Sequence, residues 1–306
     1  MISALSKPEK MVNRLPPWLK QELPGALTRS TAESIFKLGI NTVCRQAICP
    51  NANECFSKGQ ATFIILGKLC TRSCKFCNIS DKNNVIPTGI DHNEPKRLAR
   101  LVEILGLKYV VVTSVTRDDL DDGGAGQFVS VIESIHSLDR DIKVEALIPD
   151  FGGSITSLKV VVRAQPFVLA HNLETVKRLY SMIRPEADYR RSLELLKRAK
   201  ELTPGLITKS SFMLGLGETE DEVLGLMKDL RSHDCDIITL GQYLAPSPRH
   251  YYVKEFISPE QFQKYYSKGM GMGFKKVLSG PKVRSSYQAE ELSSLPLEQA
   301  EGLIYA

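Results

Sequence analysis

Long hydrophobic runs are missing from this sequence. Its longest apolar stretches, ATFIILG at 61–67 and YVVVTSV at 109–115, are well short of the ~18 residues that a membrane helix needs. The N-terminal stretch, MISALSKPEKMVNRLPPWLK, contains prolines and lacks the apolar segment of a secretory signal. We therefore expect a soluble, cytoplasmic protein with no membrane partner.

A large excess of charge of one sign is missing as well. The chain has 40 Lys and Arg residues against 35 Asp and Glu, which gives a formal net charge of +5. Such a mild balance is not the footprint of a nucleic-acid-binding protein, so we expect no nucleic-acid partner. With 42% hydrophobic residues among 306, the chain suits two ordinary domains or one barrel of about 250 residues with extensions.

Short β-rich runs alternate with helical patterns along most of the chain. The predicted strands cover 61–66, 109–115, 142–147, 166–170, 206–214 and 236–243. Clear helical periodicity falls at 98–107, 189–202 and 220–233, and the repeat of about 35 residues is typical of βα units. This order predicts a parallel sheet, either doubly wound or an incomplete barrel, with its chemistry at the C-terminal ends of the strands.

The cysteines are the most informative residues. Without a secretory signal, clustered thiols indicate metal or redox chemistry rather than a disulfide framework. A lone cysteine at 235 is expected to be a small buried hydrophobe. The other six form two triads, Cys44, Cys49 and Cys55, then Cys70, Cys74 and Cys77.

The second triad, CTRSCKFC, follows the first predicted strand directly. Three thiolates within eight residues can hold three irons of a cubane cluster, which leaves the fourth iron open to a small molecule. A structural zinc site is the alternative. It would need a fourth ligand, and no further Cys or His lies nearby in the sequence. The first triad, CRQAICPNANEC, precedes that strand, and two soft-ligand triads together favour two clusters over one.

Larger motifs give these triads a family resemblance. The C-x3-C-x2-C spacing, with Phe76 before the last cysteine, resembles the radical S-adenosylmethionine superfamily. The C-x4-C-x5-C triad and the segment RSSY at 284–287 further resemble the lipoyl synthase family. Matching segments run along almost the whole chain: CPNANECF, ATFIILG, TSVTRDDLDDGGA, HNLETV, MLGLGET, TLGQYLAPS and GPKVRSSY.

The resemblance implies an α/β fold, an incomplete (β/α)6 TIM-type barrel with extensions at both ends. Residues 1–60 would form an N-terminal extension carrying the first triad. Residues 61–280 would form the partial barrel, and residues 281–306 a tail carrying RSSY. The implied reaction inserts two sulfur atoms at carbons 6 and 8 of a protein-bound octanoyl-lysine and consumes two S-adenosylmethionine molecules.

The same resemblance implies cofactors and partners. Two 4Fe-4S clusters and S-adenosylmethionine would be bound, with the auxiliary cluster as the sulfur donor. The partners would be octanoylated lipoyl carrier domains, namely 2-oxoacid dehydrogenase E2 subunits and the glycine cleavage H protein. An electron donor such as flavodoxin or ferredoxin would reduce the enzyme.

Individual site residues also follow from the resemblance. Cys70, Cys74 and Cys77 would hold the cluster that binds S-adenosylmethionine. The first triad and Ser286 would hold the auxiliary cluster, although spacing alone does not choose between Ser285 and Ser286. Candidate contacts to S-adenosylmethionine or substrate are Phe76, Gly123, Gly124, Glu145 at an expected strand end, Asn172, Arg184, Glu218 and Arg284. The glycines equally suit a tight turn, Glu145 a surface carboxylate and Asn172 a helix cap.

Three other functions compete with this interpretation. The auxiliary cluster could relay electrons in a different radical enzyme, although a labile serine ligand would serve no purpose there. A two-cluster electron carrier would need far less scaffold than six strand–helix units. A zinc-containing nucleic-acid-binding module would be colourless, whereas iron–sulfur clusters are brown.

Overall fold

The computed structural model describes residues 15–20, 26–79 and 89–294 of the chain. At its centre lies one eight-stranded sheet whose strands follow one another in chain order. Strand β1 runs antiparallel to β2, and all other neighbouring strands are parallel. The strands are β1 Asn41–Thr42, β2 Thr62–Ile65, β3 Tyr109–Ser114, β4 Lys143–Leu147, β5 Val168–Ala170, β6 Ile207–Leu214, β7 Ile237–Gln242 and β8 Lys276–Gly280.

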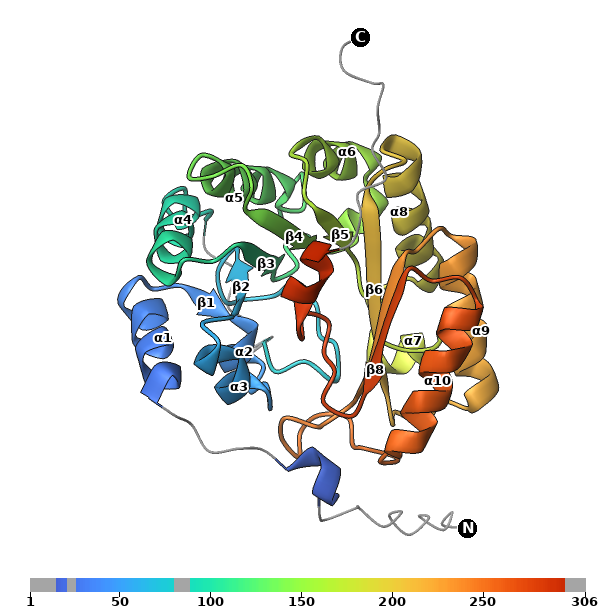
Figure 1. Cartoon of the computed structure of the whole chain (residues 1–306). Coiled ribbons are helices and arrows are strands. Elements are labelled where there is room, and N and C mark those ends of the chain that lie inside the picture. The colour runs from blue at the N-terminus through green and yellow to red at the C-terminus, as the bar shows by residue number, and fades with distance from the viewer. Residues whose placement is uncertain (1–14, 21–25, 80–88, 295–306) are drawn as a thin grey trace, which may run out of the picture.

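Helices surround the curved sheet and cover its outer face (Figure 1). The α-helices are α1 Ala26–Lys37, α2 Val43–Gln46, α3 Ala52–Ser57, α4 Glu94–Leu105, α5 Ala125–His136, α6 Ile155–Arg163, α7 Tyr180–Ile183, α8 Tyr189–Leu202, α9 Glu220–Ser232 and α10 Pro259–Gly271. The 3-10 segments are η1 Pro17–Leu19, η2 Phe151–Gly153, η3 Lys177–Leu179 and η4 Ala289–Ser294. Within the described residues no ladder joins β8 to β1, so the barrel is incomplete.

Alternate residues of the strands fill two different cores. Phe63, Val112 and Leu169 are fully buried in the large core between the sheet and the helices. Val111 and Val168 point the other way, into a smaller core inside the barrel. Because both faces of the parallel strands are buried, their sequences are nearly continuous apolar runs.

The C-terminal tail enters the interior of the barrel. Ala289 and Leu292 of η4 pack in the inner core beside Tyr109 and Ile207, and Leu292 is completely buried. Figure 1 shows this red segment at the centre of the ring of strands. The tail is therefore part of the fold.

The α/β class, the parallel sheet and the six predicted strands are confirmed. Helix α8 coincides with the predicted range 189–202 and begins where the Asp188 side chain accepts from the Arg191 backbone N–H. Helix α9, within the predicted range 220–233, begins with a capping box between Thr219 and Glu222. The sequence analysis missed β1 and β8.

None of the described helices combines the length and the apolar character needed to span a bilayer.

Candidate functional site

The first cysteine triad lies in two short helices and the turn between them. Cys44 belongs to α2, Cys49 to the turn and Cys55 to α3. Burial, with a smaller contribution from neighbouring thiols of the triad, raises the pKa of Cys44 to about 12 and that of Cys55 to about 11. The sulfurs of the triad therefore lie close enough to influence one another, a setting in which a bound cation would stabilise their thiolates.

The C-terminal tail places RSSY beside this triad, although more than two hundred residues separate them in the sequence. Ser286 Oγ lies 2.5 Å from Thr62 Oγ1, and the backbone of Thr62 hydrogen-bonds the thiol of Cys44. The Tyr287 hydroxyl donates to Glu54 Oε1 at 3.1 Å, beside Cys55. RSSY is therefore part of the first triad's surroundings, as the family resemblance implies.

The second triad occupies the loop after β2. The Thr116 backbone N–H donates to Cys70 Sγ at 3.3 Å, and the Ile79 N–H donates to Cys77 Sγ at 3.5 Å. Burial raises the pKa of Cys74, against the opposing attraction of the Arg184 guanidinium. Burial also raises the pKa of Cys77 to about 12, with Cys74 and Cys70 adding to the effect.

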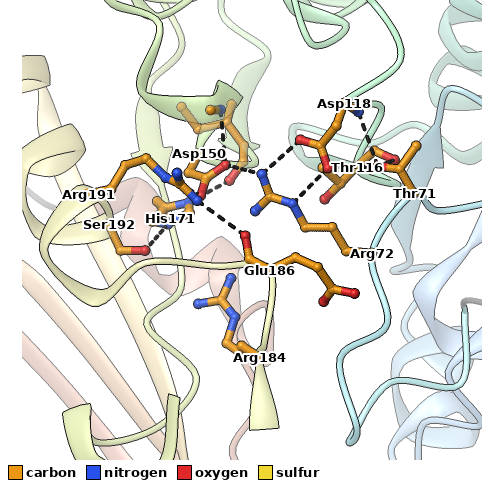
Figure 2. A network of polar contacts seen from close by, with 12 residues as sticks. Thr71, Arg72, Thr116, Asp118, Asp150, His171, Arg184, Glu186, Arg191 and Ser192 are labelled. Carbon is orange, nitrogen blue, oxygen red and sulfur yellow. Dashed lines mark hydrogen bonds and ion pairs between the residues drawn. The ribbon is translucent and has the colours of Figure 1, made fainter. Parts of the chain in front are cut away.

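An ion-pair network around Arg72, which lies between Cys70 and Cys74, holds the loop of the second triad in place (Figure 2). Arg72 donates two hydrogen bonds to Asp118, at 2.9 and 2.8 Å, and a third to Asp150 Oδ1 at 2.6 Å. Arg191 Nε donates to the other oxygen of Asp150 at 2.8 Å. Burial disfavours the charge on Arg72, but these hydrogen bonds outweigh it and raise its pKa.

The segment after β5 faces the second triad. Asn172 Nδ2 donates to Glu174 Oε1 at 3.0 Å, and Arg184 Nη1 donates to the carbonyls of Asn172 and Leu173 at 3.0 and 3.1 Å. Burial raises the pKa of Glu174, and Arg184 opposes that rise. The charge of Glu174 in turn raises the pKa of Cys74, so its carboxylate lies close to the triad.

Sequence reasoning missed Glu174. It lies two residues beyond Asn172 in HNLET, and its φ of 66° is uncommon for a residue other than glycine. The position of an acidic residue two places after a predicted contact could have indicated this role. The backbone conformation of Glu174 could not be predicted from the sequence.

The expectation that Glu145 ends a strand is wrong. Glu145 is the middle residue of β4 and shares its register with Val111 and Val168, so its side chain points into the barrel. Lys209 Nζ lies 2.8 and 3.0 Å from its two carboxylate oxygens, and the Tyr109 hydroxyl donates to Oε2 at 2.9 Å. With both oxygens engaged and the side chain fully buried, Glu145 serves an internal ion pair.

The remaining candidates make contacts within the protein, and their contact with a cofactor stays a prediction. Gly123 and Gly124 form the turn before α5 with φ of 63° and 88°, and a Cβ on Gly124 would lie 2.2 Å from Leu66 Cδ1. Glu218 accepts from the N–H groups of Gly215 and Leu216 at 2.6 and 2.9 Å. Phe76 packs against a further cluster of buried apolar side chains, which includes Phe212 and Tyr243.

The donor sets of both triads fit iron–sulfur clusters. In the part of the chain that the structure describes, no three His, Cys, Asp or Glu side chains converge as ligands of a single ion. A cubane takes one thiolate on each of several irons, so its ligands need not converge. Thiolates select iron–sulfur clusters or zinc over hard cations, and each triad leaves one cubane iron without a thiolate.

Comparison with known proteins agrees with this chemistry. The family model described as "Radical SAM superfamily" matches residues 64–230. Lipoyl synthase of Caldanaerobacter subterraneus subsp. tengcongensis is 50% identical and the match covers 92% of this chain and 97% of that protein. Lipoyl synthase of Caldicellulosiruptor saccharolyticus is also 50% identical, with 93% and 99% covered.

A solved structure supports the fold. Streptococcus suis SuiB bound to precursor peptide SuiA superposes with a TM-score of 0.56 at 12% sequence identity. The match covers 86% of this chain but only 55% of that longer chain. At this identity the likeness concerns the architecture alone.

Proposed function

The chain belongs to the lipoyl synthase family of the radical S-adenosylmethionine superfamily, and on that premise we propose which of its residues carry the reaction. The family's reaction adds sulfur to a protein-bound octanoyl group, with S-adenosylmethionine and 4Fe-4S clusters as cofactors. The substrate is accordingly an octanoylated carrier protein.

Cys70, Cys74 and Cys77 hold the cluster that binds S-adenosylmethionine. Their loop follows β2 at the C-terminal end of the strand, the end at which barrel enzymes place their chemistry. The cluster and S-adenosylmethionine, held there, would supply a carbon radical able to take a hydrogen atom from a methylene that no base could deprotonate. The protein's own part is to fix the loop through Arg72 and to exclude water from the three thiols.

Asn172, Glu174 and Arg184 form the polar wall of the S-adenosylmethionine site. Their amide, carboxylate and guanidinium groups are joined to one another by hydrogen bonds and charge, and the guanidinium interacts with Cys74. Such a wall can accept hydrogen bonds from ribose hydroxyls and pair with a carboxylate.

Cys44, Cys49, Cys55 and Ser286 hold the auxiliary cluster, the source of the inserted sulfur. The observation that carries this assignment is the contact of Ser286 with Thr62, whose backbone hydrogen-bonds Cys44. Ser285 instead donates to Asn172 Oδ1 at 3.0 Å, on the other side of the tail. A serine oxygen is a harder ligand than a thiolate, which suits an iron that must leave.

The carrier is a lipoyl carrier domain, of a 2-oxoacid dehydrogenase E2 subunit or of the glycine cleavage H protein, and the reductant is a flavodoxin or ferredoxin. Residues 1–60 act as the extension for the auxiliary cluster, 61–280 as the catalytic barrel and 281–306 as the tail that supplies the serine ligand.

Anaerobic reconstitution tests this proposal. The protein should bind about eight irons per chain. With S-adenosylmethionine, reductant and an octanoylated carrier domain it should yield 5′-deoxyadenosine and a thiolated carrier, and the auxiliary cluster should be lost as sulfur is inserted. Ser286→Cys should retain about eight irons yet stop turnover. Thiolation with the auxiliary cluster intact, or full activity of Ser286→Cys, would refute the assigned sulfur source.

A further inference from the structure

Consecutive residues of the tail face two different parts of the site. Ser286 contacts Thr62 and Tyr287 reaches α3, both on the side of the first triad. Ser285 faces the opposite side, where its hydroxyl donates to Asn172 Oδ1 at 3.0 Å across 113 residues of sequence. The tail therefore links the surroundings of the first triad to the polar wall beside the second.

Both ends of the Asn172 amide are engaged. Oδ1 accepts from Ser285 and Nδ2 donates to Glu174 Oε1. An ionised carboxylate can only accept, so the amide nitrogen must face Glu174. A rotated amide would lose the hydrogen bond to Glu174, whereas the Ser285 hydroxyl can donate to the amide oxygen or accept from the amide nitrogen. Glu174 therefore sets the orientation of the amide, and Ser285 holds the oriented amide in place from the tail side.

We propose that Ser285 is a positioning residue for the S-adenosylmethionine site, because its hydrogen bond holds Asn172 in place and, through Asn172, the carboxylate of Glu174. This inference rests on the proposed roles of Asn172 and Glu174. The same tail carries Ser286, so the cofactor and the tail are thermodynamically coupled. Coupling is reciprocal: the seated tail favours S-adenosylmethionine, and S-adenosylmethionine steadies the tail.

Equilibrium dialysis of S-adenosylmethionine against the anaerobic two-cluster protein tests this positioning role. Loss of one neutral hydrogen bond in Ser285→Ala should weaken binding about 3- to 10-fold and leave about eight irons per chain. Ser285→Thr keeps the hydroxyl and should restore wild-type affinity. Ser279→Ala is the matched control, because Ser279 loses a comparable bond, to the Phe262 carbonyl at 2.7 Å, and its affinity should be unchanged.

Trypsin cleavage after Arg284 tests the coupling from the other direction. S-adenosylmethionine should slow this cleavage in the wild type and leave it unchanged in Ser285→Ala. Wild-type affinity in Ser285→Ala, or failure of Ser285→Thr to restore it, would overturn the inference. Loss of iron from Ser285→Ala would also overturn it, since Ser285 would then hold a cluster. Absence of any binding by the wild type would overturn the proposed function itself.

Discussion

Arg72 Nη2 lies 2.6 Å from Asp150 Oδ1, although 78 residues separate them in the chain. Arg72 stands between two cysteines of the second triad, whereas Asp150 follows β4 and caps η2 by accepting from the Gly152 N–H at 3.1 Å. Asp150 also pairs with Arg191 at the start of α8. The cluster loop is thus tied to the barrel rim by ion pairs between the protein's own side chains.

Asp150→Asn should impair the second triad selectively. The change leaves buried positive charge poorly paired, and breaking a buried pair costs about 3–5 kcal/mol, here lessened because Asp118 still faces Arg72. Iron content after reconstitution should fall from about eight toward about four per chain, with the auxiliary cluster retained. The exposed pair of Asp139 with Lys108 offers the control, since Asp139→Asn should change little. Full iron loading of Asp150→Asn would contradict the role given to this pair.

Gly241→Ala should displace the tail. A Cβ at Gly241 would lie 1.8 Å from the Val283 carbonyl oxygen, which is backbone and cannot rotate away. Overpacking of this kind costs about 1–3 kcal/mol, so the variant should melt earlier and lose iron from the auxiliary site.

Gly225→Ala is the matched control. Gly225 lies in α9 with nothing within 4 Å of the added Cβ, so that variant should gain about 0.5–1 kcal/mol. Equal melting of Gly241→Ala and wild type would show that the tail does not need this close approach.

His171 should make stability depend on pH. Its ring is buried, Nδ1 lies 2.9 Å from the Ile148 carbonyl oxygen and Nε2 lies 3.0 Å from Ser192 Oγ. The carbonyl can only accept, so Nδ1 carries a proton, and burial of the ring favours the neutral form, in which Nε2 accepts from Ser192. Burial, with the nearby charge of Arg184, lowers its pKa to about 4.

The direction of this pH dependence follows because the unfolded histidine binds a proton at a higher pH than the folded one does. The stability contributed by this neutral histidine is complete above pH 6.5, where the unfolded histidine is also neutral, and declines as the pH falls toward 4. Between pH 7.5 and 5.5 the wild type should lose about 1 kcal/mol more unfolding free energy than His171→Asn. Urea unfolding at both pH values measures this difference. Parallel losses in the two proteins would mean that His171 is protonated in the fold.

Local patterns predicted most of the fold because the strands are buried on both faces. Most of the six predicted strands are largely apolar runs, so no partner is needed to recognise them, and β6 keeps apolar residues at both ends around Lys209. Strand β8, KVLSG, contains one buried residue in five and has no such signature. Strand β1 has only two residues. Their place at the ends of the sheet depends on neighbours that the local sequence does not reveal.

The candidate site likewise has residues that local sequence patterns predict and residues that only distant contacts place. The two triads could be predicted because their spacing is short and their chemistry is specific. Glu145 could not be placed, because its partner Lys209 lies 64 residues away. The choice between Ser285 and Ser286 likewise depends on Asn172 and Thr62, which are more than one hundred residues distant. The positions of these side chains depend on contacts with residues far away in the sequence. Such contacts cannot be inferred from the spacing of the motifs.

The position of η4 bears on how the polypeptide is made. Leu292 fills the interior of the barrel, yet the ribosome synthesises it after every strand that surrounds it. A nascent chain can assemble its helices and its outer core as they emerge, but the inner core lacks Leu292 until η4 has been made. Because Ser286 lies on the same tail, the surroundings of the first triad are likewise completed only after every strand of the sheet has been synthesised.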